Sequence, residues 1–154
     1  MIDREMEDSL QGLFLRIAHQ LFMKNYHQMM ALGIHPGQFP MLYLLQNQDG
    51  LTQREIARKL NVRPPTVTVT IRRLEKSGLV CRREDGEDRR VSRISLTAEG
   101  RAIAKQLREI MRRNEEQMFR GLSEAERCLQ ERFFREILAN VTEMNNRQEE
   151  ETHD

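Results

Sequence analysis

A charged run between Asp88 and Gly100 holds side chains suited to binding a polyanion. Three arginines, Arg89, Arg90 and Arg93, lie in and beside a polar loop that returns as an alternating segment. Arginine at the tip of a hairpin can enter the narrow, electronegative minor groove of A·T-rich DNA. Asp88 lies two residues before Arg90, where it can pair with an arginine and hold the loop in shape. An ordinary surface ion pair is the alternative interpretation, and it contributes little to stability.

The stretch from 64 to 77 carries a second set of residues suited to DNA. Val67, Ile71 and Leu74 recur at helical spacing, which predicts a helix with one buried stripe. Hydroxyl and guanidinium groups on the opposite face can bond phosphates or base edges, and an exposed valine can contact a thymine methyl. The DNA-binding candidates are Arg63, Pro65, Thr66, Thr68, Val69, Arg72 and Arg73. The alternative is a merely solvated helix face, on which an exposed Val69 and a double-proline start would be unusual.

The neighbouring segments predict the elements that position these two sets. Thr52 and Glu55 have the spacing of a capping box, which begins a short helix before the proline pair. Strands are predicted at 79–83 and 91–96, joined by the polar loop 84–88. The order of these elements predicts a helix-turn-helix followed by a two-stranded wing.

Helices are predicted on both sides of this unit. Apolar spacing predicts them at 9–30, 38–47 and 98–119 and from Ser123 onward, with a frayed polar tail from Asn145. The long terminal helices have apolar stripes with no obvious partner in a small winged domain. We expect these stripes to pack against a second copy of the chain, and an intramolecular bundle is the alternative.

The wing carries a recognisable signature. An Asp-x-Arg pair at Asp88 and Arg90, followed by Leu-Thr and then Gly100, resembles the wing signature of the MarR family of bacterial transcription regulators. The resemblance implies that Arg90 inserts into the groove. The family's usual recognition helix has a Ser-Thr-Val-Thr-Arg-like run, and this chain has Pro65 for the serine and Val69 for the arginine. These departures leave the base preference open and do not affect groove insertion.

The resemblance extends over nearly the whole chain and implies its organisation. We expect a mainly α fold in which a winged helix-turn-helix with a two-stranded wing is embedded in a helical dimerisation domain. Residues 1–154 would form a single MarR-like domain, with the DNA-binding region at 36–97. The dimerisation region would comprise 1–35 and 98–147.

The same resemblance implies a function. We expect a sequence-specific DNA-binding transcriptional regulator, a ligand-responsive repressor that binds a pseudo-palindromic operator as a homodimer. A winged-helix module that binds another protein and no DNA is the alternative, and the salt dependence of binding distinguishes the two. A small aromatic or anionic effector would occupy a cleft near residues 14–43. Its candidate lining residues are His19, His35, Phe39 and Tyr43, and ordinary core or surface positions are the alternative for each.

The distribution of charge favours a DNA-binding centre, and ordinary charge scatter is the alternative. Residues 51–100 hold 12 Lys/Arg and 7 Asp/Glu, a net charge of +5, whereas the segments before and after each carry −2. Neither a signal peptide nor a membrane-length apolar run is visible, so we expect a cytoplasmic protein. The sequence has no phosphate-loop or hydrolase motif and no His or Cys spacing typical of metal ligands. We therefore expect no enzymatic activity, no cofactor and no metal. For Cys81 and Cys128 we expect structural roles, and a redox role is the alternative.

Overall fold

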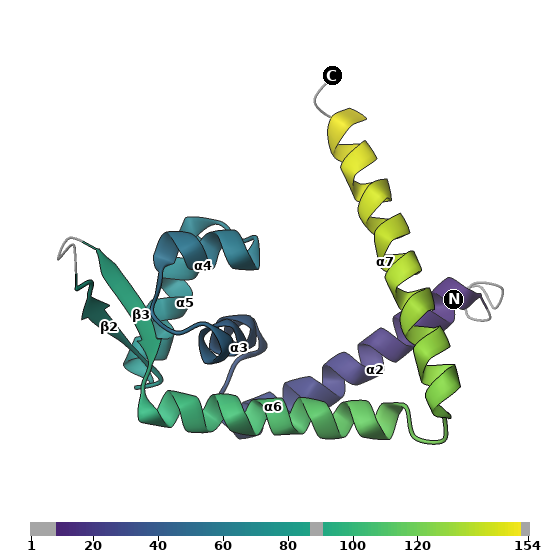
Figure 1. The fold of residues 1–154 in the computed structure, drawn as a ribbon, viewed down its shortest axis with the longest axis horizontal. Coiled ribbons are helices and arrows are strands. Elements are labelled where there is room, and N and C mark those ends of the chain that lie inside the picture. The colour runs from purple at the N-terminus through teal and green to yellow at the C-terminus, as the bar shows by residue number, and fades with distance from the viewer. Residues whose placement is uncertain (1–8, 87–90, 152–154) are drawn as a thin grey trace, which may run out of the picture. The chain divides into compact units, whose positions relative to one another are not determined.

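The computed structural model describes residues 9–86 and 91–151, which are mainly helical with one small antiparallel sheet among them (Figure 1). In chain order the elements are α2 (Leu10–Ala31), the 3-10 helix η1 (Pro36–Gln38), α3 (Phe39–Asn47), β1 (Leu51–Thr52), α4 (Gln53–Leu60), α5 (Pro64–Lys76), β2 (Val80–Glu84), β3 (Ser92–Leu96), α6 (Ala98–Met118) and α7 (Glu124–Glu151). This order confirms the predicted mainly α fold with a winged helix-turn-helix.

The chain divides into two compact units. The first ends at Arg112 and the second begins at Arg113, so the boundary lies within α6. The helix-turn-helix and the sheet lie entirely in the first unit, whereas α7 lies entirely in the second.

The core of the first unit joins α3, α4, α5, the sheet and the first half of α6. Its fully buried side chains include Leu42, Ile56, Ile71, Leu74, Ile94 and Leu107. The predicted stripe on α5 is confirmed, because Val67, Ile71 and Leu74 are all buried. Burying a side chain of this size contributes about 1.5–3 kcal/mol. This burial fixes α5 against the core, so that its other face is left at the surface.

Helix α4 begins and ends at well-defined local structures. The Glu55 amide donates to Thr52 Oγ1 over 3.2 Å, and the Thr52 amide donates to Glu55 Oε2 over 2.8 Å, which confirms the predicted capping box. At its other end Asn61 adopts a left-handed conformation with φ of 51°, which asparagine tolerates better than most residues. The Val62 amide then donates to the Ala57 carbonyl. These bonds fix the turn into α5.

The sheet has one more strand than the sequence predicted. Its order is β1-β3-β2, antiparallel throughout, and β1 pairs Leu51 with Ile94. The wing hairpin itself consists of β2 and β3, as predicted, with Cys81 opposite Ser95. The expectation of only two strands was incomplete, because a two-residue strand is too short to show period-two alternation.

The Leu-Thr and Gly100 part of the signature joins the wing to α6. Thr97 Oγ1 donates to the Gly78 carbonyl over 2.6 Å and accepts from the Gly100 amide over 3.0 Å. A Cβ atom on Gly100 would lie 1.9 Å from the Leu79 carbonyl oxygen, so no larger residue fits without a backbone shift. The start of α6 is therefore packed directly against the turn that links α5 to β2.

The second unit consists mainly of α7. Ser123 and Glu126 form a capping box at its start, as expected, with the Ser123 amide donating to Glu126 Oε2 over 2.7 Å. The sequence predicted a frayed polar tail from Asn145, whereas α7 continues to Glu151. An ion pair between Glu143 and Arg147, one turn apart, supports the helix across this point.

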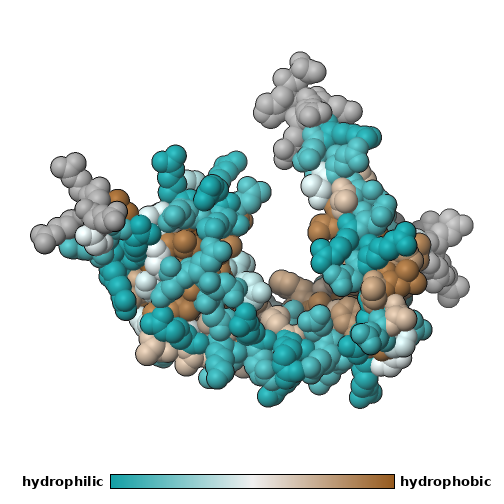
Figure 2. Space-filling view, in the orientation of Figure 1, coloured by the Kyte–Doolittle hydropathy of each residue, from teal (hydrophilic) through white to brown (hydrophobic). Residues whose placement is uncertain are grey.

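Helices α2 and α7 each expose many large apolar side chains. Figure 2 shows hydrophobic surface along α7 between hydrophilic side chains. On α2 they are Leu10, Leu13, Phe14, Leu15, Ile17, Phe22, Met23 and Met30, and on α7 they are Leu129, Phe133, Phe134, Ile137, Leu138, Val141 and Met144. A soluble monomer rarely leaves contiguous apolar surface of this kind exposed.

Candidate nucleic-acid interface

The outward face of α5 combines basic, hydroxyl and apolar side chains. Val69 is 46% exposed, although valine is usually buried. The other exposed members of the predicted set are Arg63, Pro65, Thr66, Arg72 and Arg73. A protruding helix face with an apolar centre and cationic edges matches the groups that DNA presents in its major groove, which are base edges, thymine methyls and flanking phosphates.

The first turn of α5 has no free backbone N–H group that could donate to a ligand. Pro64 and Pro65 lack an N–H group, and the amides of Thr66 and Val67 both donate to the Arg63 carbonyl, at 3.0 and 3.3 Å. Helix N-termini often bind phosphate through free amides, and this one cannot. Any phosphate contact at this end of α5 must therefore come from side chains such as Arg63.

Thr68 is oriented toward the protein interior. Its hydroxyl lies 3.0 Å from Gln53 Oε1 and 3.1 Å from the Pro64 carbonyl oxygen, and the residue is half-buried. The single hydroxyl proton is therefore used inside the protein, and Thr68 can act toward DNA only as an acceptor. Gln53, the first residue of α4, lies 15 positions before Thr68 and was not among the residues predicted from the sequence.

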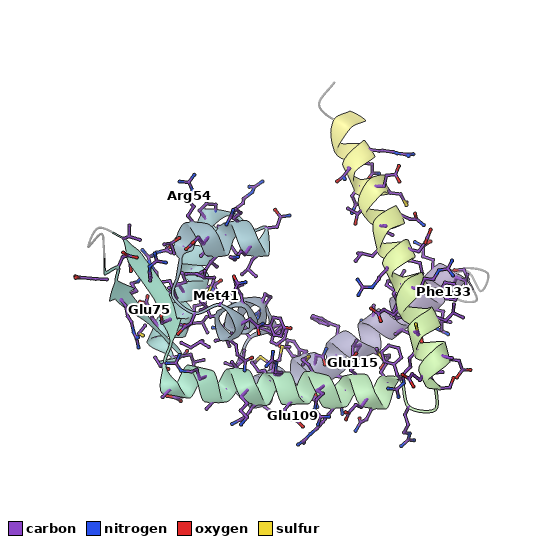
Figure 3. All side chains as sticks on the ribbon, in the orientation of Figure 1. Met41, Arg54, Glu75, Glu109, Glu115 and Phe133 are labelled. Carbon is purple, nitrogen blue, oxygen red and sulfur yellow. The ribbon has the colours of Figure 1, made fainter. Side chains whose placement is uncertain are left out.

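Positive charge dominates the helix-turn-helix. Between Gln53 and Lys76 there are seven Lys/Arg residues and two Glu residues. Both glutamates are engaged within the protein, Glu55 in the capping box and Glu75 with Arg82 over 2.9 Å. Figure 3 labels both Glu75 and Arg54, and the Arg54 side chain projects outward from α4. The predicted DNA-binding residues did not include the exposed cations of α4, which are Arg54, Arg58 and Lys59.

The capping carboxylate is held in its ionised form. The Thr52 backbone amide and then its hydroxyl lower the pKa of Glu55 below the ordinary value of 4.5, and the nearby charges of Arg93 and Arg58 lower it further. Glu55 is thus a fixed negative charge that neutralises part of the local positive potential while it stabilises the start of α4.

The wing is described on both sides of its tip. Asp88, Arg89 and Arg90, the predicted minor-groove residues, lie outside the described residues. In the adjoining strands Arg82 is paired with Glu75, and Arg83 is exposed. Arg93 contacts Asp85 and the Gly50 carbonyl, so its guanidinium is engaged within the protein.

Three of the four predicted effector residues lie at the start of η1 and on α3. The rings of Phe39 and Tyr43 lie 5.9 Å apart on α3. His35 precedes them and accepts a hydrogen bond from the Gly37 amide at its Nδ1 atom. His19 is exposed on α2 and, among the described residues, forms no hydrogen bond or ring contact with the other three.

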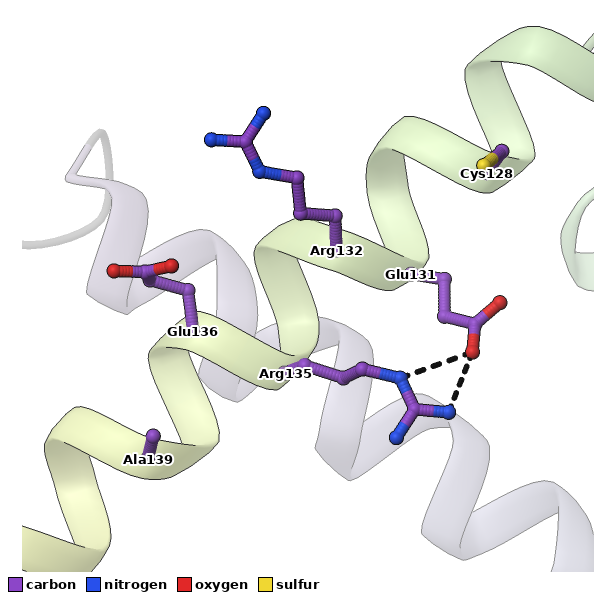
Figure 4. A pocket seen from close by; sticks show the side chains of 6 residues that line it. All are labelled: Cys128, Glu131, Arg132, Arg135, Glu136 and Ala139. Carbon is purple, nitrogen blue, oxygen red and sulfur yellow. Dashed lines mark hydrogen bonds and ion pairs between the residues drawn. The ribbon is translucent and has the colours of Figure 1, made fainter.

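A shallow, open hollow lies on α7 and involves none of the predicted site residues. It is lined by Cys128, Glu131, Arg132, Arg135, Glu136 and Ala139 (Figure 4). Glu131 and Arg135 form an ion pair of 2.6 Å across it, so part of its charge is already neutralised. Across the described part of the chain, no three His, Cys, Asp or Glu residues gather as metal ligands, and no helix is long and apolar enough to span a membrane.

Comparison with known proteins agrees with this geometry. The MarR family model matches residues 34–92, which contain η1, α3, α4, α5 and most of the sheet. The uncharacterised HTH-type transcriptional regulator YwoH of Bacillus subtilis is 34% identical over 121 residues, covering 79% of this chain and 88% of YwoH. The chain belongs to the MarR family. It is a DNA-binding transcriptional regulator and not an enzyme.

A second relative of this MarR-family protein and one solved structure have names that state a role or a bound molecule. The B. subtilis transcriptional repressor MdtR is 37% identical over 101 residues, which cover 64% of this chain and 63% of MdtR. The crystal structure of Staphylococcus aureus MepR in complex with DNA has a TM-score of 0.73 and 30% identity, covering 86% of this chain and 98% of MepR.

Proposed function

We propose that this protein binds duplex DNA in a sequence-specific manner, with α5 in the major groove and the wing in the adjacent minor groove. The observation that carries the proposal is the outward face of α5. It is exposed and cationic, and Val69 lies at its centre. Such a face has no role in the core, and its side chains complement both phosphates and base edges.

We propose different roles for the residues along α5. Arg63, Arg72 and Arg73 supply cations for phosphates or guanine, whereas Thr66 and Val69 contact base edges or thymine methyls. Thr68 and Pro65 set the backbone and orientation of the helix start, and Thr68 retains only an acceptor toward DNA. Because the first turn of α5 lacks free amides, affinity at this end depends on Arg63.

The tip of the wing would complete the interface. Arg89 and Arg90 enter or flank the minor groove, and Asp88 orients an arginine there, as the Asp-x-Arg signature implies. The described ends of the two wing strands support this assignment, because Glu84 pairs with Ser92 and the three predicted residues lie between them in the sequence.

Dimerisation would give the interface its symmetry. The apolar side chains exposed on α2 and α7 would be buried against a second copy, which makes 1–35 and 98–147 the dimerisation region and 36–97 the DNA-binding region of a single 1–154 domain. Two α5 helices related by a twofold axis match half-sites about one helical turn apart. In light scattering a species near 18.3 kDa, the mass of one chain, would contradict this part.

Repression relieved by a small ligand completes the proposed function. The similar proteins include a named repressor, MdtR, and the ring pair Phe39–Tyr43 beside His35 offers an aromatic and imidazole surface for an aromatic or anionic effector. His19, which lies on α2, is the fourth proposed lining residue. A screen of aromatic acids for loss of DNA binding tests the effector directly.

Selection of bound sequences from random duplex DNA tests the proposed function as a whole. The expected result is a pseudo-palindrome with two half-sites separated by about one helical turn, 10–10.5 base pairs. Recovery of no enriched sequence would contradict sequence-specific binding, and recovery of a single asymmetric half-site would contradict the symmetric dimer.

A further inference from the structure

Arg93 joins three parts of the winged helix that are distant in sequence. Its Nε donates to Asp85, which begins the wing loop, and its Nη1 donates to the Gly50 carbonyl over 3.0 Å. Gly50 lies 43 positions earlier, in the turn between α3 and β1. A guanidinium offers donors in a planar fork, so these two bonds fix both its position and its plane.

Asp85 is well suited to anchor the wing loop. Its side chain is only 12% exposed, whereas that of Arg93 is 43% exposed. Its backbone amide also donates to the Val91 carbonyl over 3.0 Å, which closes the hairpin. The predicted groove-binding residues follow Asp85 and precede Val91 in the sequence, and Arg93 bonds the side chain of Asp85.

Arg93 also reaches the start of the helix-turn-helix. Its backbone lies opposite Thr52 in the β1–β3 ladder, and Thr52 is the N-cap of α4. Its charge contributes to lowering the pKa of Glu55, the other member of the capping box. Through α4 the connection continues to α5, since Gln53 accepts from Thr68. Asp85 and α5 are therefore connected through Arg93, the start of α4 and the Gln53–Thr68 hydrogen bond.

We propose that Arg93 is the positioning residue of the wing and makes no contact with DNA itself. Its guanidinium, held between Asp85 and the Gly50 carbonyl, fixes the described end of the β2–β3 hairpin against the turn between α3 and β1. The sequence suggests another role, since Arg93 is one of five arginines in the wing strands and loop and could be counted as a phosphate ligand. This inference rests on the proposed function, because it concerns how the wing is presented to DNA.

Substitution of Asp85 distinguishes a positioning role of Arg93 from a phosphate-binding role, because the two roles predict opposite changes in DNA affinity. If the wing arginines acted only as positive charge, replacing Asp85 with alanine would remove a repelling carboxylate and tighten DNA binding. If Asp85 holds Arg93 in place, the same substitution releases the wing and weakens binding although the net positive charge rises. The two interpretations therefore predict opposite changes in the dissociation constant.

The experiment titrates the full-length protein against a duplex recovered by selection, using fluorescence anisotropy. We expect Asp85→Ala and Arg93→Gln each to weaken binding about tenfold, and the double variant to be no weaker than either, because both break one network. Arg83→Gln is the matched control. It lies directly opposite Arg93 in the β2–β3 ladder, is exposed and removes the same charge. We expect its effect to add to that of Asp85→Ala.

A second measurement needs no DNA. In hydrogen–deuterium exchange of the free protein, Arg93→Gln should speed exchange at the amides of Asp85 and Gly50, which donate to Val91 and Ile94, whereas Arg83→Gln should not. Equal or tighter DNA binding by Asp85→Ala, or unchanged exchange in Arg93→Gln, would overturn the positioning role. Absence of DNA binding by the wild-type protein would instead refute the proposed function, and the exchange experiment would still decide the role of Arg93.

Discussion

Thr68 Oγ1 and Gln53 Oε1 lie 3.0 Å apart and join the two helices of the helix-turn-helix by a side-chain hydrogen bond. Thr68 is on α5 and Gln53 is the first residue of α4. The bond forms beside the capping box, because Gln53 follows the N-cap Thr52 directly. This hydrogen bond thus helps to fix the orientation of α5, and of its exposed face, relative to α4.

Removing this bond should weaken DNA binding without changing its sequence preference. We expect Thr68→Val, which keeps the shape of the side chain, to lower the free energy of unfolding by about 1 kcal/mol and to weaken all duplexes similarly. The matched control is Thr66→Val on the exposed side of the same helix, which should leave stability unchanged. Thermal unfolding and selected-sequence profiles measure both effects, and a change of preference at one base pair in Thr68→Val would contradict a purely positional role.

Val69 and Arg72 should differ in what they contribute to binding. If Val69 packs on a thymine methyl, Val69→Ala should lose discrimination at one base pair of each half-site, by about 1 kcal/mol. Arg72→Ala should weaken all sequences about equally, as loss of a phosphate contact does. Selected-sequence profiles of the two variants provide the comparison. A Val69→Ala profile that matches the wild type at every position would show that Val69 does not read a base.

The capping box should make stability depend on pH in one direction. The pKa of Glu55 is lowered in the folded protein, so its ionised form contributes stability that is complete above its ordinary pKa of 4.5. That contribution is lost as the pH falls through the folded-state pKa. Because glutamine can keep the capping hydrogen bond but not the charge, we expect Glu55→Gln to be less stable than the wild type by roughly 0.3–1 kcal/mol at pH 7, with the difference shrinking below pH 4.5.

Denaturant unfolding at several pH values measures this effect. Glu115→Gln, at an exposed position on α6, is the control and should change stability little at any pH. A difference between wild type and Glu55→Gln that stays constant down to the acid transition would refute the assigned role of the Glu55 carboxylate.

The close approach at Gly100 predicts the most damaging single substitution. A Cβ atom there would lie 1.9 Å from the Leu79 carbonyl oxygen, so Gly100→Ala must displace the backbone and should cost about 3 kcal/mol of stability. Gly86→Ala is the control, because nothing lies within 4 Å of a Cβ atom at that position. Thermal melting compares the two, and equal melting temperatures would contradict the packing of α6 against the α5–β2 turn.

Local patterns predicted the elements well, and contacts between distant segments were not predictable. The spacing of Thr52 and Glu55 specified a capping box, and the i, i+4, i+7 pattern of Val67, Ile71 and Leu74 specified the buried face of α5, because both depend on neighbouring residues alone. The strand Leu51–Thr52 was missed because its pairing with β3 is a tertiary contact that two residues cannot encode.

The candidate site was predictable as a face but not residue by residue. Periodicity correctly indicates which side chains of α5 are exposed, such as Val69 and Arg72. It cannot indicate that the Thr68 hydroxyl bonds Gln53, or that Arg93 bonds Asp85 and Gly50. Those roles depend on how α4, the wing and the α3–β1 turn meet in space. The roles of Asp88, Arg89 and Arg90 stay predictions, since these residues lie outside the described part of the chain.

The salt dependence of binding to a selected duplex tests the central claim most directly. If each of two subunits places Arg63, Arg72 and Arg73 on phosphates, six counterions are displaced. The affinity should then fall about a thousandfold between 50 and 200 mM salt. Arg72→Ala should lower the slope of log affinity against log salt concentration by about two, one for each subunit. An affinity that does not change with salt, or a slope that Arg72→Ala leaves unchanged, would contradict DNA binding through the exposed face of α5.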